Sequence, residues 1–150
     1  MTERTSGAEL CAKWEGMHTV KADGLVYPYM CPANYPTQGR GIVVANMQVE
    51  PITIAEAERR FDLFFARYEA AAAKLCKVPY TENQLGALAC FCFNVGIGAL
   101  KSSTLLRKFN RGDTPEEVAA EFLKWNKAGG RVLRGLTLRR TSEAELFLRA

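Results

Sequence analysis

The 150-residue sequence predicts a single α+β domain (residues 1–150), mostly helical, in which a small antiparallel sheet lobe and a helical lobe enclose a cleft. Two observations predict this fold class. Residues 17–49 lack a helical period, and Gly and Pro punctuate short β-branched runs there, as in a loop and a small irregular sheet. The remaining chain carries repeated helix-start signals, in which Ser or Thr precedes Glu or Gln by three residues. Ligands are usually bound in clefts, so the cleft is where we expect the functional site.

The elements follow from local signals in chain order. Short strands are expected around Leu25–Tyr27 and Ile42–Val44, and only helices are expected after residue 50. The expected helices run from the Ser6–Glu9 capping box to Gly16, from Thr53–Glu56 to about Leu75, from Thr81–Gln84 to near Asn94, over Leu100–Phe109, from Thr114 with Pro115 at the first position, and over Leu136–Leu148.

Composition excludes a disordered or collagen-like chain, since 48% of the residues are hydrophobic and 24% are charged. The net charge of +4 is uneven, because residues 101–150 carry eleven Lys or Arg against six Asp or Glu. Such a surface attracts polyanions, so both nucleic acid and an anionic bacterial wall are compatible with it. Four arginines are expected on a solvated basic face, with the last two partly paired to helix carboxylates: Arg131, Arg134, Arg139 and Arg140.

The five cysteines are an odd number without a regular framework, which is typical of free thiols in a reducing compartment. Cys90 and Cys92 are expected to be buried apolar residues. We expect no metal site, since the chain has one histidine, His18, and no CxxC pair.

The N-terminus mixes charges and lacks an apolar core, so we do not expect a signal peptide. The uncharged segment Asn83–Leu100 approaches the length of a membrane span, but polar residues and glycines interrupt it, which favours a buried helix. We therefore expect synthesis in the cytosol without an export device.

Glu15 lies at the end of the first predicted helix, where the negative end of the helix dipole disfavours a carboxylate. Cys31 and Thr37 follow six residues apart in the sheet region. A carboxyl that keeps its proton, opposite a polar group across a cleft, is the arrangement of a glycosidase.

Several segments carry a resemblance to a known family. Trp14-Glu15-Gly16 is followed by Cys31-Pro-Ala-Asn-Tyr-Pro-Thr37-Gln-Gly39-Arg-Gly41, and Thr81–Leu88, Phe91–Gly98, Ser103–Leu105 and Gly129–Glu143 come later in the chain. In this order they resemble the phage-type lysozymes of glycoside hydrolase family 24, with their "EG" helix end and "(D/C)PxGxxTIGYG" motif. The resemblance runs from about Leu10 to Phe147.

The resemblance implies a lysozyme-like fold and cleavage of the β-1,4 bond between N-acetylmuramic acid and N-acetylglucosamine in peptidoglycan, without a cofactor. It implies that Glu15 is the general acid, that Cys31 replaces the family's aspartate or cysteine, and that Thr37 is its threonine. It also implies an endolysin that is a monomer, has no membrane anchor or nucleic-acid partner, and leaves the host cytoplasm for the periplasm or cell wall through a holin at lysis. The implied substrate contacts are Val43, Phe93, Asn94 and Thr104.

Departures from the family pattern leave alternatives open. The loop between Glu15 and Cys31 is longer than in short members, and Asp23 within it is a reserve candidate for the acid. The Cys31 thiol is expected to be mainly neutral at pH 7 unless a cation or helix end acts on it. The rival hypotheses are a wall peptidase that uses Cys31 and His18, and a non-catalytic module that binds glycan or nucleic acid through the basic C-terminal face.

Overall fold

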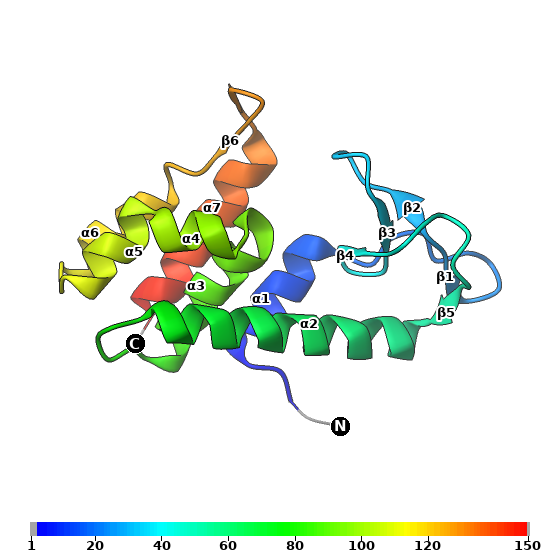
Figure 1. Ribbon diagram of the computed structural model, residues 1–150, viewed down its shortest axis with the longest axis horizontal. Coiled ribbons are helices and arrows are strands. Elements are labelled where there is room, and N and C mark those ends of the chain that lie inside the picture. Colours follow the sequence, from blue (N-terminus) through cyan, green and yellow to red (C-terminus); the bar gives the residue numbers. More distant parts are fainter. Residues whose placement is uncertain (1–2, 150) are drawn as a thin grey trace. The chain divides into compact units, whose positions relative to one another are not determined.

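The computed structural model describes residues 3–149 and divides into two units, which are described separately (Figure 1). One unit comprises Ala12–Ala66, and the other comprises Met1–Cys11 with Arg67–Ala150. Two helices, α1 (Ser6–Glu15) and α2 (Ile54–Leu75), contain residues of both units. The α+β class and the mostly helical content that the sequence predicts are confirmed.

The unit of residues 12–66 contains the predicted small sheet region. Strands β2 (Tyr29–Met30), β3 (Pro36–Gln38) and β4 (Ile42–Val43) form an antiparallel sheet, in which Tyr29 pairs with Thr37 and Thr37 with Val43. A second antiparallel pair joins β1 (Leu25–Val26) to β5 (Ile52–Thr53). The strands are only two or three residues long, as the Gly and Pro punctuation predicts.

Six apolar side chains form the core of this unit: Ala12, Val26, Ile42, Ala57, Phe61 and Phe65. The buried Gln38 side chain connects the three-stranded sheet to the β1–β5 pair, because its Nε2 donates to the carbonyls of Val26 and Glu50, both at 3.0 Å. These hydrogen bonds replace those that a longer sheet would make.

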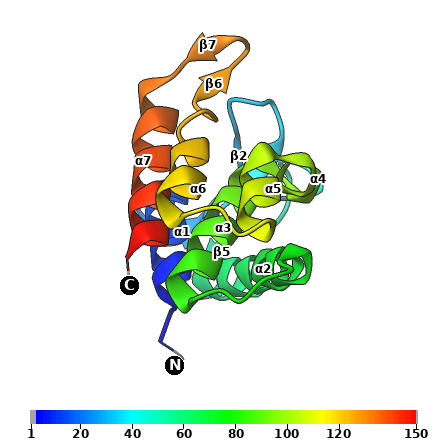
Figure 2. The ribbon, with the colours of Figure 1, turned by 90° about the vertical axis from the view of Figure 1, so that its left-hand side faces the viewer.

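The other unit is a helical assembly (Figure 2). Besides parts of α1 and α2, it contains α3 (Glu82–Val95), α4 (Ile97–Ser102), α5 (Thr104–Asn110), α6 (Pro115–Phe122), β6 (Lys127–Ala128), β7 (Arg131–Val132) and α7 (Arg134–Leu148). Helix α7 packs along α3 and α6, and α5 packs on α6.

Helix α3 is the centre of this unit, with seven consecutive buried residues from Gly86 to Cys92. Both bonds of the predicted Thr81 capping box are present at its start. Gly86 lies against the backbone of Gly7 in α1, and a Cβ added to Gly86 would lie 2.9 Å from the Gly7 Cα. The two helices therefore cross at a distance that only glycine allows.

Helix starts agree with the sequence at Thr53, Thr81 and Thr114, but two other predictions are wrong. Thr5 rather than Ser6 accepts from the first turn of α1, through the Ala8 N–H. The helix expected over Leu100–Phe109 is two helices, because extended Ser103 donates to the Leu100 carbonyl and accepts from the Leu106 N–H. A serine hydroxyl that satisfies both groups caps one helix and ends the other.

The sequence prediction also missed the β6–β7 hairpin and started the last helix two residues late, at Leu136. Gly129 and Gly130 form its two-residue turn, with φ of 57° and 79°. Two glycines between short extended runs are a known signal for this type of turn.

The prediction of a solvated face is wrong for Arg139 and Arg140, which are 5% and 0% exposed, whereas Arg131 and Arg134 are exposed. Both buried guanidiniums pair with Glu143 of the same helix, so the expected pairing with a carboxylate is confirmed. Arg140 also lies over the Phe91 ring, at 4.9 Å.

All five cysteines are free thiols, and Cys90 and Cys92 are fully buried as expected. The Cys90 side chain is not purely apolar in role, because its sulfur accepts from Arg139. The backbone carbonyl of Cys90 accepts from the same guanidinium. Among residues 3–149, no helix combines the length and the apolar character that crossing a bilayer requires. Within the same residues, His, Cys, Asp and Glu form no group that could hold a metal ion.

Candidate active site

Glu15 is the last residue of α1, and the chain leaves the helix through Gly16, which has a φ of 69°. The Gly16 N–H donates to the Ala12 carbonyl and closes the final turn. The half-buried Glu15 carboxyl lies against Gly41, where an added Cβ would overlap Glu15 Oε1. The turn between β3 and β4 therefore forms one wall around this carboxyl.

Arg40 holds this turn against the parts of α1 and α2 that belong to the same unit. Its Nη1 donates to the Ala12 carbonyl at 2.6 Å, and its Nε and Nη2 pair with the Glu58 carboxylate in α2. A guanidinium that bridges a carboxylate and a helix-end carbonyl is a rigid, charge-assisted link. Arg40 thus holds the neighbouring Gly41 next to Glu15.

The three-stranded sheet places a row of side chains on one face. Tyr29, Thr37 and Val43 are directly paired across β2, β3 and β4, and paired residues of antiparallel strands share a face. Thr37 is buried, and its hydroxyl donates to the Tyr35 carbonyl at 2.9 Å. Val43, predicted to contact substrate, is 58% exposed at the edge strand.

Cys31 begins a tight turn directly after β2. The Cys31 and Asn34 N–H groups donate to the Tyr35 and Cys31 carbonyls, and Asn34 adopts a φ of 67°, which asparagine tolerates. The Tyr35 N–H in turn donates to the Cys31 Sγ at 3.4 Å.

These contacts change the expected ionisation of the thiol. The pKa of Cys31 is lowered from its ordinary value, chiefly by the hydrogen bond from the Tyr35 N–H, against the opposing effect of burial. The sequence predicts a lower pKa for the Cys31 thiol only if a cation or a helix end lies nearby. The groups that lower its pKa are instead hydrogen-bond donors of the turn.

Tyr29 connects the predicted site residues electrostatically. Burial raises the pKa of its phenol, and the negative charges of Glu15 and Cys31 raise it further. Both groups therefore act on one phenol, which the sequence interpretation did not single out. Glu15, Cys31, Thr37 and Val43 all belong to the unit of residues 12–66.

Asp23, the reserve candidate for the acid, is poorly suited to donate a proton. It accepts from the Tyr27 hydroxyl and from the Leu25 N–H at 3.0 Å. These bonds, with the tyrosine hydroxyl first, lower the pKa of Asp23 below its ordinary value. A carboxyl held in its charged form does not act as a general acid near neutral pH.

His18 is bonded to the helix end rather than to Cys31. Its Nε2 lies 2.9 Å from the Glu15 carbonyl oxygen, and its ring lies 5.0 Å from that of Tyr29. Within residues 3–149, the hydrogen-bond partners of the Cys31 sulfur come from its own turn and from Thr37. This geometry lacks the Cys–His pair that a cysteine peptidase requires.

The other predicted substrate residues lie in the helical unit. Phe93 is half-buried, with its ring 5.1 Å from that of Tyr68, and Asn94 is exposed at the end of α3. Thr104 is exposed at the first position of α5 and accepts from Arg107 at 2.8 Å. Asn94 Oδ1 accepts from the buried Arg140 at 2.8 Å, so the Arg139–Glu143–Arg140 cluster fixes the orientation of its amide.

Two residues at the site had only weak signals in the sequence. Arg40 is a departure from the family motif that has no evident role until its bond to Ala12 is seen. Gly41 is part of the motif, but its purpose depends on contact with a residue 26 positions earlier. No local pattern encodes either contact.

Gly41→Ala is expected to lower the hydrolytic rate by about 100-fold, because the new methyl group displaces the Glu15 carboxyl by a distance on the order of 1 Å. The matched control is Gly24→Ala, whose φ of 78° imposes similar strain while its Cβ would meet nothing within 4 Å. Steady-state rates of both variants test this, and equal losses would show that strain alone is responsible.

Comparisons with known proteins identify the family of this chain. A sequence model of the family "Phage lysozyme" matches residues 12–143. The chain is 40% identical to an endolysin of Bacillus phage B103 over 144 residues, which cover 95% of this chain and 52% of that protein. The chain therefore spans about half the length of that relative. It is 38% identical to an endolysin of Acyrthosiphon pisum secondary endosymbiont phage 1, with 94% of each chain covered.

A solved structure shows the same fold over both units. The muramidase domain of SpmX from Asticaccaulis excentricus superimposes with a TM-score of 0.83 at 29% identity, covering 99% of this chain and all of that one. The family match covers the helix end with Glu15, the sheet with Thr37 and the helices up to Glu143. The chain belongs to the phage lysozyme family.

Proposed function

We propose that this chain hydrolyses the β-1,4 bond between N-acetylmuramic acid and N-acetylglucosamine in bacterial peptidoglycan, as an endolysin does at the end of a phage or prophage cycle. The observation that carries the proposal is the position of the Glu15 carboxyl, held at a helix end against Gly41. The Cys31 thiol and the Thr37 hydroxyl belong to the same unit.

In this mechanism Glu15 donates its proton to the glycosidic oxygen as the bond to the anomeric carbon breaks. Cys31 and Thr37 position the nucleophile at the opposite face of the sugar. Thr37 has one hydroxyl proton, which it donates to the Tyr35 carbonyl, so its oxygen is left to accept from a water molecule. The Tyr35 N–H orients the Cys31 thiol for the same purpose.

Substrate contacts are assigned to both units. Val43 offers an exposed apolar surface beside Thr37, and Phe93, Asn94 and Thr104 offer an aromatic ring, an amide and a hydroxyl. These are the groups that bind the apolar faces and the acetamido and hydroxyl groups of amino sugars. The active enzyme is proposed to be a monomer in which residues 1–150 act as one catalytic domain.

The route to the wall is part of the proposal. The enzyme accumulates in the host cytoplasm and reaches the periplasm or cell wall when a holin opens the membrane. Some relatives are named SAR-endolysins, which points to a different export route for those proteins. Lysis by this chain in cells that lack any holin would exclude the holin route.

Cys31→Asp is expected to retain most of the activity, within about tenfold of wild type, whereas Cys31→Ala is expected to lose about 100-fold. Asp supplies an acceptor that holds a water molecule, and Ala leaves that water with Thr37 as its one remaining proposed acceptor. A positioned acid or base contributes about 10²–10⁴-fold. Turbidity loss of purified walls measures both variants. Equal rates for Cys31→Ala and wild type would remove the thiol from the mechanism.

The Cys31 thiol is expected to react with iodoacetamide at a midpoint pH below the ordinary value of about 8.5, because its hydrogen bonds favour the thiolate. Burial raises the pKa of both Cys76 and Cys92 to about 11, so these thiols stay unlabelled. Mass spectrometry of labelled peptides across a pH series measures the midpoint, and denatured protein is the control. A midpoint at or above the ordinary value would show that the turn does not stabilise the thiolate.

Release of reducing ends from purified peptidoglycan tests the proposed function against its rivals. A glycosidase releases reducing ends without new free amines, and a peptidase that uses Cys31 and His18 releases amines. A non-catalytic binding module releases neither. Reducing ends without amines support the proposal, and either other result overturns it.

A further inference from the structure

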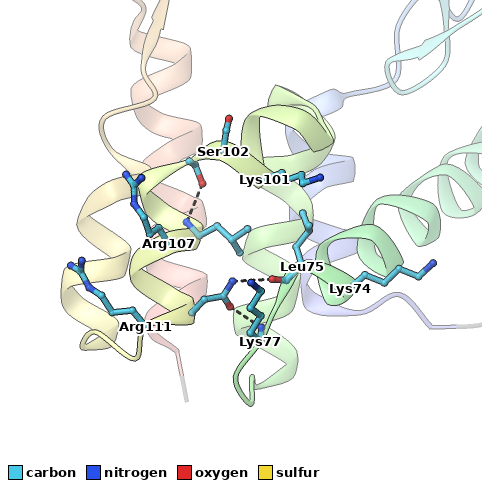
Figure 3. Close-up of a pocket in the computed structure, with 10 residues that line it drawn as sticks. Lys74, Leu75, Lys77, Lys101, Ser102, Arg107 and Arg111 are labelled. Atoms are coloured by element: carbon cyan, nitrogen blue, oxygen red, sulfur yellow. Dashed lines mark hydrogen bonds between the residues drawn. The ribbon is translucent and has the colours of Figure 1, made fainter.

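A basic hollow lies in the helical unit, where the end of α2 and the following loop meet α4 and α5 (Figure 3). Its volume is about 570 Å³, within the range of ligand-binding sites. None of the predicted catalytic or substrate residues lines it. Five cations surround it, and no carboxylate lines it: Lys74, Lys77, Lys101, Arg107 and Arg111.

Among the described residues, four of these five cations have no carboxylate partner. Arg111 forms a two-bond pair with Asp113, and Arg107 donates only to the Thr104 hydroxyl. Within residues 3–149, Lys74, Lys77 and Lys101 form no ion pair. Elsewhere in the same unit, the acidic Glu121 is paired with Lys108 and Lys124. Four cations that no described carboxylate offsets therefore surround this hollow.

The base of the hollow is fixed by Asn110. Its Nδ2 donates to the Leu75 carbonyl at 2.9 Å, and its Oδ1 accepts from the Lys77 N–H at 2.8 Å, as the dashed lines in Figure 3 show. This side chain ties the end of α2 to the end of α5. These two bonds hold the backbone at Leu75 and Lys77 in place.

The groups that line the hollow determine which kind of anion can bind there. The Ser102 and Ser103 hydroxyls donate to the Gly98 and Leu100 carbonyls, so the donors available to a ligand are the cationic ends. In Figure 3 the labelled Lys74 and Lys101 extend to one side, and Arg107 and Arg111 to the other. Single contacts of exposed cations are weak, so useful affinity requires several anionic groups along one chain.

We propose that this hollow binds a linear polymer of phosphate groups without bases, of the kind attached to bacterial walls, and so retains the enzyme on its substrate. Phosphate is a preferred partner of lysine and arginine. No aromatic residue lines the hollow, so single-stranded nucleic acid would lack the surfaces on which its bases stack. This inference depends on the proposed function in one respect: the polymer is assigned to the bacterial wall because the wall is the proposed substrate.

Binding of fluorescent inorganic polyphosphate to the whole chain tests the site directly. Lys74→Gln, Lys77→Gln and Lys101→Gln combined are expected to weaken binding about tenfold or more at low salt. They should also reduce the salt slope by about one for each cation removed. The control combines Lys127→Gln, Arg131→Gln and Arg134→Gln, which remove the same charge from exposed positions around the β6–β7 hairpin. The control is expected to bind as wild type does.

Three results would overturn the proposal: equal weakening in both triple variants, equal competition by inorganic phosphate at the same total phosphate, and tighter binding of an oligonucleotide of equal charge. Two wall preparations distinguish polymer binding at the hollow from hydrolysis. The triple lysine variant of the hollow should lose activity on intact walls. It should keep the wild-type rate on peptidoglycan whose phosphate polymers have been extracted. An inactive wild type that still binds polyphosphate would overturn the proposed function alone.

Discussion

Glu15→Gln is expected to lower the rate of wall hydrolysis by about 10²–10⁴-fold while leaving the fold intact. The amide has nearly the same size and keeps an acceptor oxygen beside Gly41, so the local packing is preserved. It cannot donate the proton that the leaving glycosidic oxygen requires. Turbidity assays measure the rate, and circular dichroism confirms folding.

The control for this variant is Glu50→Gln, which changes an exposed carboxyl of the same unit and should keep the wild-type rate. Wild-type lysis by a folded Glu15→Gln would remove this carboxyl from the mechanism. Asp23 would not replace it readily, since its hydrogen bonds lower its pKa.

Glu143→Gln is expected to lower the free energy of unfolding by about 3–5 kcal/mol, a large part of the stability of a domain this size. The Glu143 carboxylate is fully buried and offsets two buried guanidiniums, those of Arg139 and Arg140. Removing its charge takes away the carboxylate that both guanidiniums share. Urea unfolding followed by circular dichroism measures the change.

Glu145→Gln is the control for this prediction, because Glu145 lies on the same helix and is exposed. Its effect should stay within about 0.5 kcal/mol. A loss below about 1 kcal/mol for Glu143→Gln would show that the neighbouring sulfur, carbonyl and ring contacts suffice to hold the arginines. Since Arg140 orients Asn94, we also expect a higher KM in this variant.

Local signals in the sequence predicted the helices whose starts depend on residues within a single turn. Thr81 with Gln84 and Thr114 with Pro115 act within a single turn, so the helices that they start could be located. Ser103 could not be interpreted in this way, because its hydroxyl serves two helices at once. The burial of Arg140 also depends on tertiary packing, since nothing in its neighbourhood along the chain distinguishes it from the exposed Arg134.

The candidate site was predicted less completely than the fold. Helix position and family motif pointed to Glu15, Cys31 and Thr37, whose catalytic roles remain predictions. Two supporting features could not be predicted, because each depends on residues far apart in the chain. The Arg40 guanidinium reaches both Ala12 and Glu58, and the phenol of Tyr29 responds to both Glu15 and Cys31.

The sugar at the new reducing end tests the central claim most directly. Purified peptidoglycan is digested, reduced with borohydride and hydrolysed, and the amino-sugar alcohols are identified by mass spectrometry, with Glu15→Gln in parallel. The proposed reaction predicts that the alcohol of N-acetylmuramic acid accumulates with the wild type and falls at least about 100-fold with Glu15→Gln. Accumulation of the N-acetylglucosamine alcohol, or equal amounts of product from both proteins, would contradict it.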